Sequence, residues 1–469
     1  MTVQGNVLRA YGVRFPCAAY VLLRIAPGRE AEARALLERP RDRVSFDREP
    51  LALPGRAHLN LAFTFQGLQA LGAPVDELPG DFQQGAAHRA PEIGDRVDSA
   101  PDRWEFGNPP AHVLVVVHAT DEAARAQCLR ELDLSGGPLE VVHEQHAGLL
   151  HRGEAAVGES SETCSAVFNR EHFGFADGCS QPAVEDIDDD PDGDGVHQTE
   201  LPTRFVRRIL ETVGFKQPKR TWRGVARGEF VLGYENEDWD QPKGSASPIG
   251  RDGTFMVYRK LYQDVEGFDE HTTRCAEELG LHVDEVRARI VGRWQDGTPL
   301  TLSPDGPNQE IARDRARANH FGYLDDPAGL KCPIGAHIRR TNPRDGLPAG
   351  GEATMRHRMI RRGMPYTGPG DDDRGLVFVC FGASIERGFE TVQRQWCSTG
   401  FALGLDQPDY LLQQRPAPGQ APTGTLQIRS TQVLRPPPRP FVTVRGTEYL
   451  LLPGREALAR ITGGPEATP

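Results

Sequence analysis

The sequence predicts an α+β fold built from two similar modules. Apolar runs of strand length alternate along the chain with segments whose apolar residues recur at helical spacing. One such set occupies the N-terminal part of the chain and a second set follows, which indicates two similar modules. The chain has 469 residues, of which 38% are hydrophobic, so a buried core is available for each of two or three domains.

The first set of elements begins with a buried strand at residues 18–25, which read AAYVLLRI. A Pro-Gly turn follows, and residues 28–39 have the pattern of an amphipathic helix. Residues 59–71 are mixed in character. The run HVLVVVH at residues 112–118 indicates another strand, which is the last element predicted in the first set.

The second set contains three strand-like runs and two helical segments. The strands are expected at residues 253–261, 375–381 and 441–452. Helical spacing extends over residues 269–292 and again over residues 385–399.

We expect the boundary between the modules in or directly after the acidic stretch 185–199, EDIDDDPDGDGVHQT. The predicted domains are therefore residues 1–200 and residues 201–469. Three aspartates and a glycine of the stretch have calcium-loop spacing, but Leu201 stands where the loop requires its last acid. A solvated linker is the favoured interpretation, and a weak calcium or manganese site is the alternative.

The segment 173–182, FGFADGCSQP, carries the first candidate site. Asp177 lies between Gly174 and Gly178, and glycines allow the backbone to come close to a flat ligand. A buried carboxylate held in this way is a candidate for proton transfer. The alternative is an aspartate that caps a turn.

Two later segments carry further candidates. The stretch 331–345, KCPIGAHIRRTNPRD, places His337 in a short apolar run and follows it with three arginines. The stretch 359–366, MIRRGMPY, contains Arg361. Guanidinium groups are natural bidentate partners of carboxylates.

Together these segments resemble the dye-decolorising peroxidase family, in its longer bacterial and fungal branch. FGFADG is similar to the GxxDG motif of the family, KCPIGAHIRRTNPRD to its proximal segment, and RRGMPY to its RRG-x-P-Y segment. The runs QGNVL, FTFQGL, EFVLGYE and ASIERGF are similar to other landmarks, so the resemblance extends over the whole chain.

The resemblance implies two ferredoxin-like domains, each an antiparallel sheet with peripheral helices. The first domain would carry the GxxDG segment, and the second would hold most of a haem. The C-x-x-C-H signature of covalent attachment is absent, so we expect haem b held non-covalently. The implied activity is oxidation of dyes, phenols or other aromatic reductants by hydrogen peroxide through a ferryl intermediate.

The same resemblance assigns roles to individual residues. His337 is expected to ligate the haem iron on the proximal side. Asp177 is expected to move the peroxide proton, and Arg361 to stabilise the charge that develops as the O–O bond breaks. The remaining cofactor contacts are expected from Arg344 and Arg339, toward the haem propionates, and from Leu376 and Phe378, at the distal roof.

Two alternatives compete with this hypothesis. A haem carrier or haem-iron handling protein needs only the proximal histidine and the arginines, so the presence of Asp177 and Arg361 favours catalysis. A non-haem metal site would use a histidine-rich segment, but its spacing does not reproduce H-E-x-x-H. That segment contains His143, Glu144, His146 and His151.

Composition limits the partners. The chain has 54 basic and 66 acidic residues, a net charge of −12, which argues against nucleic acid or an anionic membrane as the main partner. No apolar run approaches the roughly 20 residues that span a bilayer. Because the family pattern begins directly after the first methionine, we expect a cytoplasmic protein that acts on peroxide and a small aromatic reductant.

Overall fold

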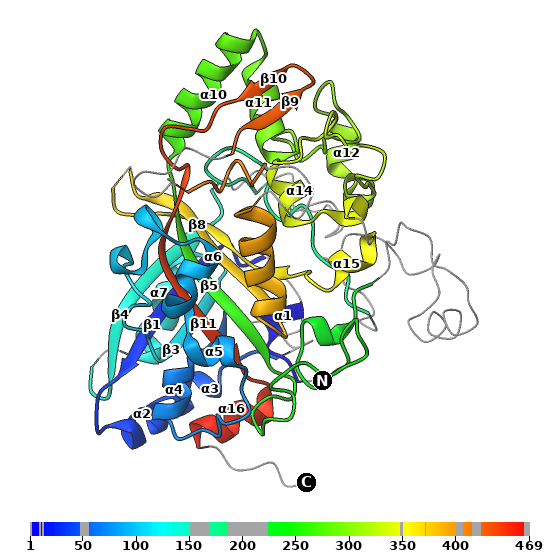
Figure 1. Ribbon diagram of the computed structural model, residues 1–469. Coiled ribbons are helices and arrows are strands. Elements are labelled where there is room, and N and C mark those ends of the chain that lie inside the picture. Colours follow the sequence, from blue (N-terminus) through cyan, green and yellow to red (C-terminus); the bar gives the residue numbers. More distant parts are fainter. Residues whose placement is uncertain are drawn as a thin grey trace, which may run out of the picture.

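One antiparallel sheet runs through the molecule, with helices packed around it (Figure 1). This computed structural model confirms the predicted α+β class, with antiparallel pairing between the strands of the sheet. The structure describes residues 2–8, 11, 14–46, 56–134, 136–150, 169–185, 224–347, 350–370, 372–399, 407–414 and 424–463. Residues 186–199 of the predicted linker and the boundary at residue 200 lie outside the described residues.

The N-terminal half contributes four strands in the order β4-β1-β3-β2. Along the chain, helices lie between β1 and β2 (residues 30–41), between β2 and β3 (residues 65–93) and between β3 and β4 (residues 122–132). Without the helices between β2 and β3, the order is the β-α-β-β-α-β of a ferredoxin-like module. The bounds are β1 (Cys17–Ile25), β2 (Ala57–Phe63), β3 (Val113–Ala119) and β4 (Leu139–Gly148).

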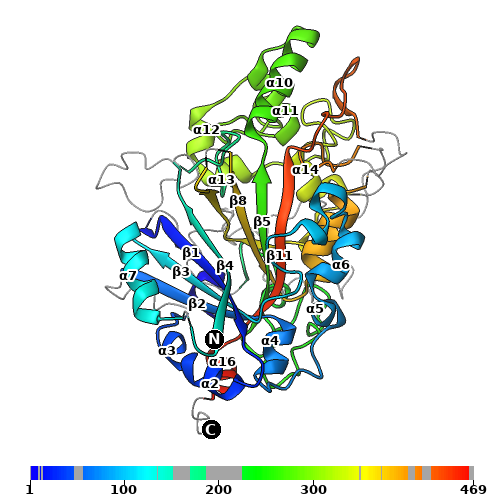
Figure 2. The ribbon, with the colours of Figure 1, turned by 90° about the vertical axis from the view of Figure 1, so that its left-hand side faces the viewer.

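The C-terminal half repeats this arrangement. Its strands follow the order β11-β5-β8, and the short strands β6 and β7 both pair with β8. The two groups of strands stand side by side in Figure 2. The bounds are β5 (Thr254–Gln263), β6 (Ile360–Arg361), β7 (Met364–Thr367), β8 (Arg374–Gly382) and β11 (Val442–Leu452), with a separate hairpin of β9 (Leu426–Arg429) and β10 (Gln432–Leu434).

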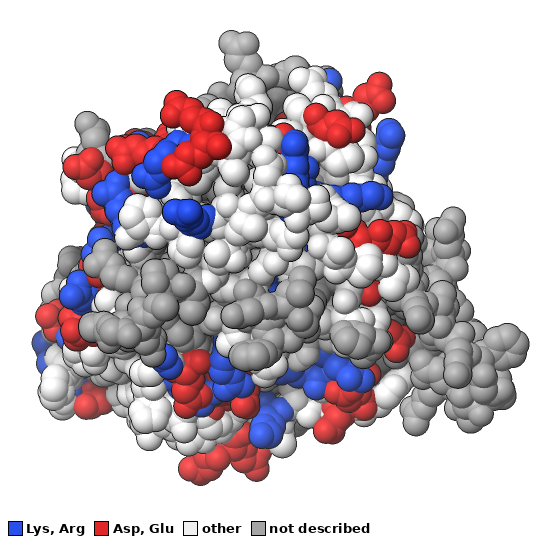
Figure 3. Space-filling view, turned by 45° about the horizontal axis from the view of Figure 1, so that its top comes forward, with Lys and Arg blue, Asp and Glu red and all other residues white. Residues whose placement is uncertain are grey.

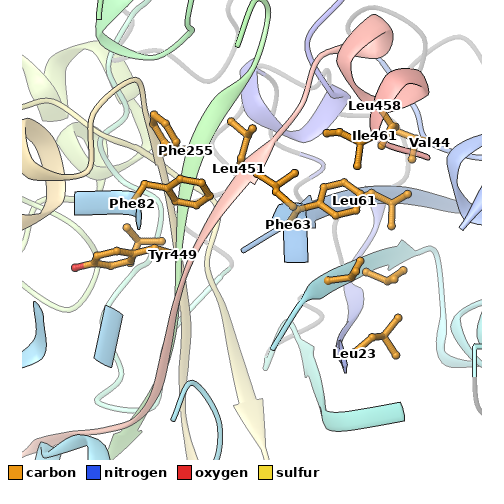
Figure 4. Close-up of a cluster of buried hydrophobic side chains, with 14 of the residues drawn as sticks. Leu23, Val44, Leu61, Phe63, Phe82, Phe255, Tyr449, Leu451, Leu458 and Ile461 are labelled. Carbon is orange, nitrogen blue, oxygen red and sulfur yellow. The ribbon is translucent and has the colours of Figure 1, made fainter. Parts of the chain in front are cut away.

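The two halves join edge to edge between β2 and β11, where Phe63 is paired with Leu451. Apolar side chains from both halves pack over this seam (Figure 4). The chain then returns to the N-terminal half, because the helix after β11, α16 (Arg455–Thr462), packs against α2 (Glu30–Leu36) and α3 (Glu38–Arg41). The halves therefore share one core.

Most predicted elements are present, and some need correction. The helix expected over residues 28–39 is two short helices, α2 and α3, which meet at Leu37. The helix expected over residues 269–292 is two helices, because Gly280 adopts a φ of 65° and ends the first. A further correction is β4, which the sequence left unassigned because its polar and apolar residues do not alternate cleanly. The helices not yet named are α1 (Gly5–Leu8), α4 (Phe65–Ala70), α5 (Gly80–Gln84), α6 (Ala86–Ile93), α7 (Glu122–Leu132), α10 (Val265–Leu279), α11 (Val283–Val291), α12 (Gln309–Arg313), α13 (Arg315–Asn319), α14 (His337–Thr341), α15 (Gly351–Met355) and the π-helical segments Glu386–Glu390 and Val392–Cys397.

Acidic and basic side chains are interspersed over the face shown in Figure 3. This distribution agrees with the modest net charge of −12. Among the described residues, no helix has both the length and the apolar character needed to cross a membrane.

Candidate active site

A cavity of about 320 Å³ brings together the segments that the sequence singled out. Its walls come from the strand face of the C-terminal half, from α11 and α14, and from the loop that contains Asp177. The volume is within the range of small-molecule sites. Predicted site residues that line it are Asp177, His337, Arg344, Arg361, Leu376 and Phe378.

His337 is the first residue of α14, and its imidazole is oriented by a buried carboxylate. Its Nδ1 atom lies 2.7 Å from Oδ2 of Asp409, whose side chain is fully buried. The other oxygen of Asp409 accepts hydrogen bonds from the backbone N–H groups of Leu411 and Leu412. Burial lowers the pKa of His337, but the charge and hydrogen bond of Asp409 outweigh it, so the pKa is raised overall. Nε2 is left as the ring nitrogen available to the cavity.

Asp177 sits in a loop whose shape depends on the two predicted glycines. Gly174 and Gly178 have φ values of 88° and 72°, a region that other residues rarely adopt. Oδ1 of Asp177 accepts a hydrogen bond of 2.7 Å from the backbone N–H of Gly178. Burial raises the pKa of Asp177, although this N–H and the charge of Arg361 act in the opposite direction. Asp177 is therefore more easily protonated than an exposed aspartate.

Arg361, on β6, is tied to the Asp177 loop by two sets of contacts. The side-chain amide of Gln181 exchanges two hydrogen bonds of 3.0 Å with the backbone of Arg361, one as acceptor and one as donor. The Arg361 guanidinium donates to the carbonyl oxygen of Ser180. Two motifs that lie 180 positions apart in the chain are thereby held in one fixed arrangement.

The arginines that follow His337 have different positions. Arg344 lines the cavity, donates to the carbonyl oxygens of Asn319 and Phe321, and lies over the Phe321 ring at 3.9 Å. Arg339 is not among the residues that line this cavity. Its guanidinium instead bonds to Asp326 and to the carbonyl oxygen of Cys332. Arg339 therefore stabilises the 326–332 turn and does not line the cavity where the ligand is expected.

Three residues of the site were missed by the sequence reasoning. Asp409 lies 72 positions from His337 in a segment without a motif, so nothing in the sequence pointed to it. Gln181 stands in the quoted FGFADGCSQP run, but its role becomes visible only from its contact with Arg361. Glu171 lines the cavity and accepts hydrogen bonds from the backbone N–H groups of Phe173 and Phe175.

The rival metal site is not supported by the geometry. His143 and His146 lie on β4, where odd- and even-numbered side chains point to opposite faces. His151 lies outside the described residues. Among the residues that the structure describes, no group of three or more histidines, cysteines or acids is placed to hold a metal ion.

The residues around the cavity fit a haem. An imidazole with one nitrogen held by a carboxylate has the other free for iron. Leu376 and Phe378 supply an apolar wall from alternate positions of β8. Near Arg344, the side-chain oxygen of Asn342 is buried and has no hydrogen-bond partner in the described part of the chain. A polar end and an apolar wall are what an amphipathic macrocycle with carboxylate groups requires.

Comparisons with known proteins agree with this chemistry. A family model described as Dyp-type peroxidase, C-terminal, matches residues 242–402, which include His337 and Arg361. A dye-decolorizing peroxidase from Mycena epipterygia is 28% identical over 466 residues, covering 89% of this chain and 77% of that protein. The solved structure of an ancestral D-type dye-decolorizing peroxidase is 26% identical with a TM-score of 0.74, and 98% of each chain is covered.

A third relative matches only part of the chain. A deferrochelatase from Shigella sonnei is 40% identical over 185 residues, which cover 35% of this chain and 41% of that protein. The similarity to peroxidases therefore extends along most of the chain, whereas the similarity to the deferrochelatase is stronger but local.

Proposed function

Because the chain belongs to the dye-decolorising peroxidase family, we propose that it is a haem-dependent peroxidase that oxidises dyes, phenols or other aromatic reductants with hydrogen peroxide. The observation that carries the proposal is that Asp177, His337 and Arg361, from three separate segments, line one cavity. Non-covalent haem b would supply the redox chemistry when bound, and Nε2 of His337 would bind its iron. Arg344 would bind a propionate, and Leu376 and Phe378 would cover the distal side.

The protein's own groups then have defined tasks. Asp177 accepts a proton from hydrogen peroxide at its carboxylate and returns it to the departing oxygen. Arg361 compensates the negative charge that develops on that oxygen, from a position that Gln181 and Ser180 hold fixed. Asp409 holds His337 in the tautomer that presents Nε2 to the cavity.

Substitution of these residues tests the proposal. Asp177→Asn and Arg361→Leu should bind haem with an unchanged Soret band. In rapid-mixing experiments they should react with one equivalent of peroxide more slowly, by about 10²- to 10⁴-fold and about 10²- to 10³-fold respectively. His337→Ala should shift the Soret band and lose haem affinity. Wild-type rates in either distal variant would remove that residue from the mechanism.

Haem-iron handling is the second candidate, and the local match to a deferrochelatase favours it. A protein of that kind would bind haem through His337 and release iron, with incidental peroxidase activity. The two candidates are separated by adding peroxide to the haem-loaded protein. A spectrum that changes within milliseconds to seconds and recovers with a reducing dye supports the peroxidase. Haem that is inert to peroxide but loses its iron supports the alternative.

A further inference from the structure

A buried ion pair on the inner wall of the cavity has polar atoms that the protein does not satisfy. Arg259, on β5, and Asp95, just after α6, are 3% and 2% exposed and both line the cavity. They share one hydrogen bond, 2.7 Å from Nη2 of Arg259 to Oδ1 of Asp95. The Nε and Nη1 atoms of Arg259 and the Oδ2 atom of Asp95 have no hydrogen-bond partner in the described part of the chain.

A second buried pair nearby shows what a purely structural ion pair looks like in this protein. Arg89 and Glu390 bond through two parallel contacts of 2.6 and 2.5 Å. The third nitrogen of Arg89 is taken by Gln84, and Glu390 also accepts from the hydroxyl of Tyr449. This pair does not line the cavity, and each nitrogen and oxygen of its charged groups has a hydrogen-bond partner among these contacts. The Arg259–Asp95 pair differs in both respects.

Unsatisfied buried charges are costly, so such groups are normally completed by another molecule. The chemistry of the open atoms restricts what that molecule is. Arg259 offers N–H donors, and Asp95 offers a carboxylate acceptor beside them. The pair is neutral as a whole, so an anion would meet the Asp95 carboxylate and a cation would meet the Arg259 guanidinium. A neutral hydroxyl, which accepts and donates at once, satisfies both.

The walls next to the pair are aromatic and aliphatic. The guanidinium carbon of Arg259 lies 5.2 Å from the ring centroid of Phe389, and that ring is 6.1 Å from the ring of Phe378. Val392 and Val444 also line the cavity. We propose that the part of the cavity between Arg259, Asp95 and Phe389, called the recess below, is a binding subsite for a phenol. The phenol hydroxyl would lie between Arg259 and Asp95, and its ring would pack against Phe389. The inference rests on the proposed function, because it locates a reductant of that reaction.

Binding without peroxide tests the subsite independently of catalysis. The haem-loaded protein is titrated by calorimetry with phenol and with anisole, whose methyl ether accepts a hydrogen bond but cannot donate one. Phenol should bind about tenfold more tightly or better, because anisole leaves Asp95 unsatisfied. Equal affinities would overturn the proposal, and would mean that water alone completes the pair. If the protein does not react with peroxide but still binds phenol more tightly than anisole, only the proposed function is contradicted.

Two variants test whether Asp95 causes the preference for phenol over anisole. Asp95→Asn keeps the shape of the side chain and an acceptor for Arg259, but it turns the Oδ2 position into a donor. The preference for phenol over anisole should fall to within about threefold. Glu390→Gln, in the pair away from the cavity, should retain the wild-type preference. An unchanged preference in Asp95→Asn would place phenol elsewhere and overturn the proposal.

A crystallographic measurement covers the case in which Asp95→Asn does not fold. Wild-type crystals soaked with 4-iodophenol should show the anomalous signal of iodine inside the recess, with the phenol oxygen within hydrogen-bond distance of Arg259 and Asp95. Iodine bound only outside the recess would overturn the proposal.

Discussion

Asp409, behind His337, and Asp177, in the cavity wall, differ in the hydrogen bonds that they accept, and this difference supports the separate roles proposed for them. Asp409 accepts hydrogen bonds from His337 and from two backbone N–H groups, so its side chain is held in one orientation. Within the described part of the chain, Asp177 accepts a single hydrogen bond, from the backbone N–H of Gly178, and it lines the cavity. A carboxylate with open positions can exchange a proton, whereas one with saturated oxygens serves best to orient its neighbour.

Replacing Asp409 should alter the electronic character of His337. In Asp409→Asn the neutral amide no longer supports a partly anionic imidazole, so the ferric/ferrous midpoint potential of the haem-loaded protein should become more positive. The peroxide reaction should slow by about 10- to 100-fold. Asp326→Asn is the matched control, because Asp326 is also buried and accepts several backbone N–H groups, but it supports Arg339. A potential that is unchanged in Asp409→Asn would contradict the assignment.

The pH dependence of the peroxide reaction should report Asp177. The carboxylate must be ionised to accept the peroxide proton, and burial raises its pKa above the ordinary 3.8. The rate constant should therefore be highest at neutral pH and fall as the pH is lowered through an apparent pKa above 3.8. Stopped-flow measurements across the acid range check this. In Glu171→Gln the rate constant should still fall at low pH, as in the wild type. If this fall disappears in Glu171→Gln but persists in Asp177→Asn, the titrating group is Glu171.

At the scale of elements, the site depends on a loop and a two-residue strand that have little structure of their own. The loop is shaped by Glu171, which bonds to two of its backbone N–H groups, and Gln181 fastens it to β6. Such contacts replace the regular hydrogen bonds that a longer element would supply. The position of Arg361 is thus a property of two segments.

Removing the Gln181 side-chain amide should separate these two segments. Gln181→Leu keeps the volume but loses both hydrogen bonds to Arg361, each worth about 1 kcal/mol. Haem binding should be unchanged, while the peroxide rate should fall about tenfold as Arg361 loses its fixed position. Gln145→Leu is the control, because Gln145 of β4 is also buried, and this variant should react like the wild type. A Gln181→Leu protein that retains the wild-type rate would show that Arg361 keeps its position without Gln181.

Sequence periodicity predicted the elements whose burial is uniform. β1 and β3 are buried along nearly their whole length and read as continuous apolar runs. β4 is partly exposed, and its histidines and acids hide the strand pattern. In the same way His337 and Arg361 could be found from local motifs, whereas Asp409 could not, because only the fold brings residue 409 to residue 337.

At the scale of the whole molecule, the two halves are coupled through the seam and through the cavity. Asp95 belongs to the N-terminal half, yet it lines a cavity whose other walls are mostly C-terminal. Arg89 likewise pairs with Glu390 across the halves. The sequence predicted two modules of the same kind, but pairing between β2 and β11 depends on long-range packing that no local pattern encodes.

Glu448 offers a test of this coupling through stability. It lies on β11, is 2% exposed, and accepts a hydrogen bond of 2.6 Å from the backbone N–H of Ala111, just before β3. Burial raises its pKa from 4.5 to about 8, although this N–H and the charge of Arg24 partly oppose the shift. Between these values the folded protein keeps a proton that the unfolded chain releases.

The free energy of unfolding should therefore decrease as the pH rises from 4.5 to about 8, by up to about 1.4 kcal/mol per pH unit from this residue. Glu448→Gln is neutral throughout and can still accept from Ala111, so it should lose this slope. It should match the wild type near pH 4.5 and exceed its stability near pH 8. Urea unfolding at several pH values measures both, and Glu456→Gln, at an exposed position of α16, should keep the wild-type slope. Parallel pH profiles for Glu448→Gln and the wild type would mean that this carboxyl group ionises normally and that the seam tolerates its charge.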